Sequence, residues 1–213
     1  MIKTNSLSFS YDGKKRFIFP DISIDAGGSL LILGQSGVGK TTLLHLLAGL
    51  MKPTTGSFQL DSENVTSLSG AALDKFRGKN IGIVFQQNHF IDALNVVENL
   101  TLAQELSRVK PDREICKSLL VELNLDHKLN ARVKQLSEGE KQRASIARAL
   151  VNNPKLILAD EPTSALDDKN CDAVYELLST QADKIGSALI IVTHDGRLKS
   201  KMPNHLILEN IQN

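Results

Sequence analysis

Apolar side chains along the chain follow two patterns, which predict two kinds of β-strand. At residues 2–9 and 17–24 they stand at mostly even spacing in a β-rich composition, as in strands of a half-buried antiparallel layer. Further along they form unbroken runs, which are typical of parallel strands covered by helices on both faces. These runs occupy residues 30–33, 81–85, 155–159 and 187–192, and residues 205–210 are expected to form a last strand.

Helical periodicity fills much of the chain between these runs. Pro111-Asp112 is a start signal for one helix, and Asp167 or Asp168 can cap another. Strands covered by helices in this way predict an α/β fold with a mixed sheet core and an N-terminal antiparallel β layer. We expect helices at about 95–108, 112–123 and 169–184.

The composition suits one compact unit with an inserted lobe, because the chain has 213 residues and 41% of them are hydrophobic. No apolar run approaches the ~18 residues that cross a bilayer, and residues 1–5 lack the apolar stretch of a signal peptide. We therefore expect a cytosolic chain, with any membrane path in a separate polypeptide. A formal net charge of +1 argues against a general binder of nucleic acid or membrane surfaces. We interpret the basic cluster Lys14-Lys15-Arg16 as a solvated hairpin turn.

Residues 34–41 read Gly-Gln-Ser-Gly-Val-Gly-Lys-Thr, between the apolar run at 30–33 and a helical pattern at 43–48. Glycines in this strand–loop–helix context let successive backbone N–H groups curl around a polyphosphate at a helix N-terminus. We therefore predict that the chain binds a nucleotide. Lys40 would reach its β- and γ-phosphates, and the Thr41 hydroxyl would be a ligand of Mg²⁺. The predicted phosphate-binding residues are Gly34, Gln35, Ser36, Gly37, Val38, Gly39, Lys40, Thr41 and Thr42.

Two further segments indicate how this nucleotide is used. Residues 136–143, Leu-Ser-Glu-Gly-Glu-Lys-Gln-Arg, open a helix, and residues 156–162, Leu-Ile-Leu-Ala-Asp-Glu-Pro, form an apolar strand that ends in two carboxylates. With the loop at 34–41, this ordered set resembles the ATPase subunits of ABC transporters, in which an LSGGQ-type signature precedes the Walker B strand. The resemblance covers essentially the whole chain. Other elements of that family stand in the same order at Tyr11, Gln86, Ser164-Ala165-Leu166-Asp167 and His194.

The resemblance implies a P-loop NTPase fold of ABC type. Residues 1–86 and 137–213 would form a RecA-like core with the antiparallel β layer, and residues 87–136 would form an inserted α-helical subdomain. The implied activity is hydrolysis of ATP with Mg²⁺, which would power separate integral-membrane permease subunits. The chain would then lie on the cytoplasmic face of the membrane through its permease, and no nucleic acid partner is implied.

Asp160 and Glu161 stand at the carboxyl end of a predicted parallel strand, where α/β sheets place their ligands. Neighbouring residues on a strand point opposite ways, so these two cannot share one task. By resemblance, Asp160 holds Mg²⁺ through water, while Glu161 orients and polarises the water that attacks the γ-phosphate. From the residues alone, a helix cap or a surface charge is the alternative. By the same resemblance, His194 bonds the γ-phosphate, and Gln86 is a ligand of Mg²⁺ or of the attacking water.

Tyr11 would stack its ring on adenine, although an aromatic side chain at the end of a β layer can also be simply packed. The signature segment would act in trans: Ser137 and the backbone N–H of Gly139 would clamp the γ-phosphate held by the P-loop of a second protomer. The resemblance thus implies a head-to-tail dimer, and it adds Asp167 to the nucleotide-binding set.

The signature departs from the family pattern at two positions, where Glu138 replaces the first Gly and Glu140 replaces Gln. A carboxylate in the first helical turn suits the helix dipole, but one that faces a γ-phosphate would repel it. We therefore expect Glu138 to point away from the nucleotide, since Ser137 and Gly139 are kept.

Residues 77–86 and 159–163 resemble the subgroup that serves lipoprotein-releasing, macrolide-exporting and bacitracin-type peptide-resistance systems. An alternative is a regulatory ATPase like that of the ABC-type cell-division complex, which signals to a cell-wall hydrolase and transports nothing. Soluble ABC ATPases of DNA repair or translation carry long coiled-coil insertions or tandem ATPase units, and this chain has neither. A small-molecule kinase or GTPase is disfavoured because such enzymes lack the segment at 136–143.

Overall fold

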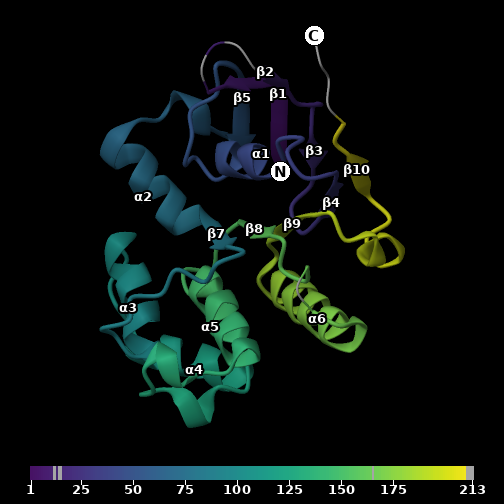
Figure 1. Ribbon diagram of the computed structural model, residues 1–213. Helices are drawn as coiled ribbons and strands as arrows, with labels where there is room; N and C mark the ends of the chain where they lie inside the picture. The colour runs from purple at the N-terminus through teal and green to yellow at the C-terminus, as the bar shows by residue number, and fades with distance from the viewer. Residues whose placement is uncertain (12, 14–15, 165, 210–213) are drawn as a thin grey trace.

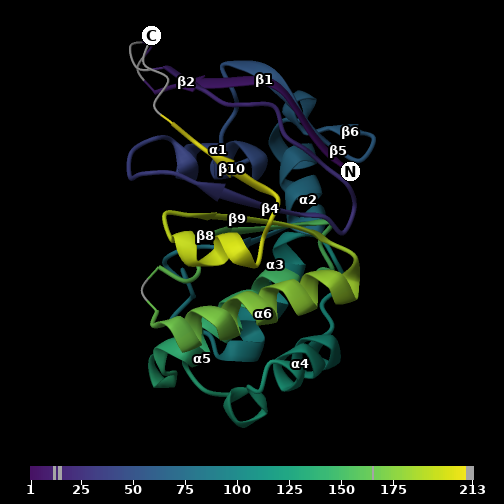
Figure 2. The ribbon, with the colours of Figure 1, turned by 90° about the vertical axis from the view of Figure 1, so that its right-hand side faces the viewer.

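The computed structural model describes residues 1–11, 13, 16–164 and 166–209. Within these residues the chain forms two five-stranded sheets, drawn in Figure 1. Figure 2 shows the layers from the side: the antiparallel sheet lies above helix α1 (Lys40–Leu47), and the parallel sheet lies between α1 and the helices below it. The α/β fold with an N-terminal antiparallel layer is thereby confirmed.

The antiparallel sheet is built around β1 (Ile2–Ser10), which pairs with β2, β3 and β5. The strand expected at 17–24 is wrong in its extent, because Pro20 lacks the backbone N–H that a continuous ladder needs. Of the expected basic turn, Arg16 opens β2, while Lys14 and Lys15 lie outside the described residues. The remaining strands are β2 (Arg16–Ile18), β3 (Ser23–Ile24), β5 (Thr55–Leu60) and β6 (Glu63–Asn64).

The second sheet is parallel throughout, in the order β10-β4-β9-β8-β7. All five of its strands fall on the predicted apolar runs. The last is shorter than expected, and residue 210 lies outside the described part of the chain. The strands are β4 (Ser29–Leu33), β7 (Ile81–Val84), β8 (Leu156–Asp160), β9 (Ala188–Thr193) and β10 (His205–Ile207).

Side chains of this sheet alternate between two hydrophobic cores, as the pleat of a strand requires. Leu31 and Leu33 of β4 belong to the core shared with the helices below, whereas Leu30 and Ile32 belong to the core shared with α1 and the antiparallel layer. Because both faces are covered, every residue of β8 is buried.

Helices α3, α4 and α5 gather in a lobe at the bottom of Figure 1, beside α6. Three of the four lie where the periodicity places helices, and α5 starts at the predicted signature segment. The lobe contributes apolar residues, among them Leu100 and Leu120, to the core that the parallel sheet shares with the helices below it. A domain boundary at residues 87 and 136 stays a prediction. The helices are α3 (Val96–Leu106), α4 (Arg113–Glu122), α5 (Glu138–Leu150) and α6 (Asp168–Ile185).

Helix α2 (Gly70–Asn80) has no counterpart among the sequence expectations. None of its residues is fully buried, and Leu73 and Phe76 alone pack against the core shared with α1, which is too short a pattern for periodicity to detect. Short 3₁₀ turns connect the larger elements, at η1 (Val65–Ser67), η2 (Asp126–Lys128), η3 (Val133–Gln135) and η4 (Gly196–Ser200). No helix in the described part of the chain is long and apolar enough to span a membrane.

Candidate nucleotide-binding and catalytic site

The loop between β4 and α1 is shaped by glycines that no other residue could replace without strain. Gly37 and Gly39 have φ values of 83° and 101°, in the left-handed region that L side chains rarely adopt. A Cβ on Gly39 would also lie 2.6 Å from Cδ1 of Phe17, and one on Gly34 would lie 2.8 Å from the carbonyl oxygen of Leu208. The backbone can therefore curl over the N-terminus of α1, where its N–H groups suit an anion.

Lys40 is the first residue of α1, and its side chain folds back over the loop. Its Nζ donates to the carbonyl oxygens of Gly34, at 2.8 Å, and Gln35, at 3.0 Å. The same ammonium lies 3.7 Å from Oε1 of Glu161, and the Lys40 side chain is only 8% exposed. A cation is thus held at the floor of the loop, close to the carboxylate that ends β8.

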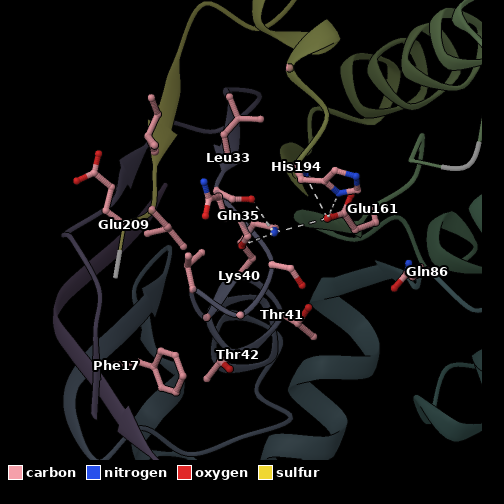
Figure 3. Close-up of a pocket in the computed structure, with 18 of the residues that line it drawn as sticks. Phe17, Leu33, Gln35, Lys40, Thr41, Thr42, Gln86, Glu161, His194 and Glu209 are labelled. Carbon is pink, nitrogen blue, oxygen red and sulfur yellow. Dashed lines mark hydrogen bonds and ion pairs between the residues drawn. The ribbon is translucent and has the colours of Figure 1, made fainter. Parts of the chain in front are cut away.

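A cavity of about 1200 Å³ opens above this loop. Figure 3 shows Lys40, Glu161 and His194 meeting on one side of it, with Glu209 on the other side. Predicted residues supply much of its lining: all of 34–42, together with Gln86, Glu161 and His194. Sequence reasoning missed a second group of lining residues, which come from β2, the end of β4, the turn η4, and β10 with the residues just after it: Phe17, Leu33, Gly196, Lys199, Ile207, Leu208 and Glu209.

The adjacent carboxylates Asp160 and Glu161 point to different partners, as predicted. Asp160 is the last residue of β8 and is 6% exposed, and this burial raises the pKa of its carboxyl, against a hydrogen bond from Thr41 that lowers it. Its Oδ1 is buried and has no hydrogen-bond partner among the described residues. Glu161 has already left the strand, with a φ of 50°. This turn, rather than strand alternation alone, carries its side chain toward His194.

The Glu161 carboxylate accepts hydrogen bonds from the end of the neighbouring strand β9. The Thr193 hydroxyl donates to Oε2 at 2.7 Å, and the backbone N–H of His194 lies 3.2 Å from Oε1. Nδ1 of His194 is 2.9 Å from the same Oε1, as the dashed lines in Figure 3 show. Because β8 and β9 are parallel neighbours, their carboxyl ends deliver these groups to one edge of the sheet.

Gln86 and Tyr11 stand farther from this centre. Gln86 lines the cavity but lies apart from Thr41 in Figure 3. Tyr11 is 65% exposed and is not among the lining residues; its hydroxyl is 2.9 Å from Oγ1 of Thr42, and its ring packs edge-on against Phe9. Phe17 is the aromatic residue that lines the cavity. The adenine-stacking role of Tyr11 stays a prediction.

The signature segment lies away from the cavity, since none of residues 136–143 lines it. Ser137 caps α5, and its Oγ donates to Oε2 of Glu140 at 2.9 Å, while that oxygen also accepts the Ser137 backbone N–H. The bond from the Ser137 backbone N–H, with a further bond to His127, lowers the pKa of Glu140 to about 2. Gly139 follows in the first turn.

Two other predicted residues lie at helix starts. The Glu138 carboxylate is 83% exposed and pairs with Nζ of Lys141 at 2.6 Å. Asp167 caps α6 and accepts the backbone N–H of Asn170 at 2.9 Å. Ala165 of the motif before this cap lies outside the described residues. The nucleotide contacts of Ser137, Gly139 and Asp167 stay predictions.

Comparisons with known proteins identify the family. The ABC transporter family model matches residues 20–164. The lipoprotein-releasing system ATP-binding protein LolD of Idiomarina loihiensis is 36% identical, over 99% of this chain and 95% of that protein. The LolD protein of Syntrophotalea carbinolica is 42% identical, over 84% of this chain and 79% of its own.

Solved structures similar to this chain belong to the same family. A dimeric ATP-binding cassette in a post-hydrolysis state with ADP and Pi has a TM-score of 0.87 and 33% identity, over 99% of this chain and 95% of that one. A dimeric bacterial ABC transporter cassette has a TM-score of 0.86 and 32% identity, over the full length of both chains. Together with the P-loop and its facing carboxylates, these matches show that the chain belongs to the ABC transporter family, as one of its ATPase subunits.

Proposed function

We propose that the chain is the ATP-hydrolysing subunit of a lipoprotein-release system, and that it powers a separate membrane permease. The observation that carries the catalytic part is the position of Glu161. Its carboxylate lies 3.7 Å from the P-loop ammonium of Lys40 and is oriented by two donors, Thr193 at the end of β9 and His194 directly after it. A general base must be held within reach of the phosphate site, and this arrangement supports that role.

The residues at the end of β8 and the start of α1 also fit Mg²⁺. The buried Oδ1 of Asp160 has no hydrogen-bond partner among the described residues, and the Thr41 hydroxyl lies beside the same carboxylate. Oxygen donors of this kind suit a hard cation. We assign Asp160 and Thr41 to hold it together with the nucleotide phosphates; Gln86 lies apart from Thr41, and its role as a ligand stays a prediction. When bound, Mg²⁺ supplies positive charge to the β- and γ-phosphates.

The chain's own residues divide the remaining work. Lys40 and the backbone N–H groups of residues 34–39 bind the phosphates and offset their charge. Glu161 accepts hydrogen bonds from β9 on one side, which leaves its carboxylate fixed to orient a water and take up its proton. We assign His194, which is 61% exposed beside Glu161, to bond the γ-phosphate.

The second half of each site is assigned to another protomer. Ser137 and Gly139 do not line the cavity among the described residues. They lie at the start of α5, where a helix offers backbone N–H donors to an anion. Both solved cassettes described above are dimeric. A head-to-tail pair would bring the signature of each chain to the P-loop of the other.

The substrate class comes from relatives that match 99% and 84% of this chain and carry the name lipoprotein-releasing system ATP-binding protein. The test is to reconstitute the chain with a candidate permease of a lipoprotein-releasing system, in proteoliposomes that hold a fluorescent lipid-anchored protein. ATP should release this protein, and ADP should not. ATP hydrolysis without release, together with activation of a cell-wall hydrolase, would instead establish the regulatory alternative.

A further inference from the structure

A network of hydrogen bonds centred on Asp195 joins the two loops that follow β8 and β9. The Asp195 side chain is 8% exposed. Its carboxylate accepts Nε of Arg197 at 2.9 Å, NH2 of Arg197 at 2.7 Å and the Thr163 hydroxyl at 3.3 Å. Thr163 lies just after Glu161, and Asp195 just after His194. The carboxylate thus links the loops that carry Glu161 and His194, two of the predicted catalytic residues.

Arg197 extends this link to the start of α6. Its NH1 donates to Asp168 at 2.6 Å, and its NH2 donates to the carbonyl oxygen of Leu166 at 3.1 Å. A planar guanidinium can satisfy these partners together, because its five donors point in fixed directions. The hydrogen bonds to Asp195 and Asp168 raise the pKa of Arg197, and the bond from Arg197 lowers that of Asp195. Both groups therefore stay charged.

Asp195 is connected to Glu161 through a single group, the hydroxyl of Thr193. The backbone N–H of Asp195 donates to Oγ1 of Thr193 at 3.0 Å, and the same hydroxyl donates to Oε2 of Glu161 at 2.7 Å. A hydroxyl has one hydrogen, so accepting the Asp195 N–H on a lone pair leaves that hydrogen for Glu161. Anchoring Asp195 thereby keeps the Thr193 donor aimed at the carboxylate.

We propose that Arg197 is a positioning residue for ATP hydrolysis: it anchors Asp195, and through the Thr193 hydroxyl it holds Glu161 in its reactive orientation. The role rests on the proposed function, since it requires Glu161 to act on the attacking water. Arg197 itself does not line the cavity. Its loss should therefore slow the chemical step more than it weakens ATP binding.

The first test measures kcat and KM for ATP in Arg197→Ala, at a temperature where circular dichroism shows the variant folded. We expect kcat to fall at least about tenfold and KM to change less than about threefold, because a small displacement of a catalytic group is costly. Arg197→Lys keeps the positive charge but loses the planar set of guanidinium donors, so its kcat should lie between those of wild type and Arg197→Ala. Lys201→Ala is the matched control: it also removes a cation paired with acids of α6, Asp172 and Glu176, but contacts neither Asp195 nor Thr193.

The second test is a double-mutant cycle with Thr193→Val, and Thr193→Ser serves as the control that keeps the hydroxyl. If Arg197 acts through Thr193, the double variant should be about as slow as the slower single variant. If the double variant instead lost kcat by the product of the two single losses, the proposal would be overturned. A folded Arg197→Ala variant with kcat within about twofold of wild type would overturn it as well. If Arg197→Ala does not fold, the cycle is run with Arg197→Lys. Absence of hydrolysis in the wild-type chain would instead contradict the proposed function.

Discussion

Among single residues, Lys40 is the charge held closest to the phosphate-binding loop. Its ammonium is tied to the carbonyl oxygens of Gly34 and Gln35, so it is already placed for an anion above them. Lys40→Ala removes charge-assisted bonds worth about 1.5–3 kcal/mol, so ATP should bind roughly 10–100-fold more weakly. Titration with a fluorescent ATP analogue measures this, with the exposed Lys52→Ala as control. Unchanged affinity in Lys40→Ala would show that the loop is not the phosphate site.

Glu161→Gln should separate binding from chemistry. The amide keeps the shape of the side chain and can still accept the Thr193 hydroxyl, but it cannot take up a proton from water. We expect phosphate release to fall at least about 100-fold, with the affinity for ATP changed less than about threefold. Phosphate release and nucleotide titration are compared with Glu176→Gln, which changes an exposed glutamate of α6. Wild-type turnover in Glu161→Gln would remove Glu161 from the catalytic role.

At this scale the sequence predicts the groups that lie on the P-loop and at the ends of β8 and β9. It can do so because a short motif carries both the chemistry and the local backbone, as with Gly37 and Lys40. Phe17 and Glu209 could not be found in this way. They reach the cavity only through strand pairing between distant parts of the chain, and no local pattern records which strands become neighbours.

Among the helices, α5 carries the departure from the family signature. Glu138 lies in its first turn, is 83% exposed and pairs with Lys141 at 2.6 Å. Glu138→Gly would lose this pair, worth about 0.2–0.5 kcal/mol, and a helix propensity of up to about 1 kcal/mol. In the Glu161→Gln background, the dissociation constant of the ATP-bound dimer should therefore change less than about tenfold. Analytical ultracentrifugation measures this dissociation constant. A decrease of more than about tenfold in Glu138→Gly would show that Glu138 faces the partner's γ-phosphate.

The start of α5 should also give the protein a measurable sensitivity to acid. The folded state lowers the pKa of Glu140 from 4.5 to about 2, chiefly through the Ser137 backbone N–H and His127. A lowered pKa means that folding favours the ionised carboxylate. Its contribution to stability is complete above pH ~4.5 and is lost as the pH falls toward ~2. Wild type should unfold at a higher temperature than Glu140→Gln at pH 7, and the difference should shrink between about pH 5 and pH 3.

Thermal unfolding of the two proteins by circular dichroism, at several pH values, measures this difference. His127 and Lys128 face the same carboxylate, so His127→Ala is included to measure how much of the difference depends on the His127 contact. A difference that stays constant down to pH 3 would contradict the assigned cause.

Elements were predictable where their apolar pattern is strong, and α2 and the β5–β6 hairpin show the limit. Helix α2 fully buries none of its residues, and β6 has only two residues, so neither shows a regular spacing of apolar residues along the sequence. Pro20 shows a different limit, since apolar spacing continues across it while the hydrogen-bond ladder does not. Apolar spacing alone therefore records neither α2 and β6 nor the break in pairing at Pro20.

For the whole molecule, the decisive feature is that the signature helix and the P-loop cavity are separate on one chain, because no residue of 136–143 lines the cavity. If each site combines the P-loop and Glu161 of one protomer with Ser137 of the other, two different inactive chains can complement each other. Ser137→Ala and Glu161→Gln each inactivate both sites of their own homodimer. In a mixed dimer, the Glu161 of the first chain and the Ser137 of the second meet in one intact site.

Mixing the two variants should therefore restore hydrolysis. At equal concentrations about half of the dimers are mixed, and each has one intact site of two, so the rate can reach at most about a quarter of the wild-type rate. The restored rate should follow the product of the two concentrations at low protein, since it depends on association. Phosphate release is measured for each variant alone and for the mixture, and Ser137→Ala mixed with Ser137→Ala/Glu161→Gln is the control with no intact site. If the site were complete within one chain, no mixture could regain activity, and the two halves would have to meet by a movement of α5 toward the P-loop of the same protomer.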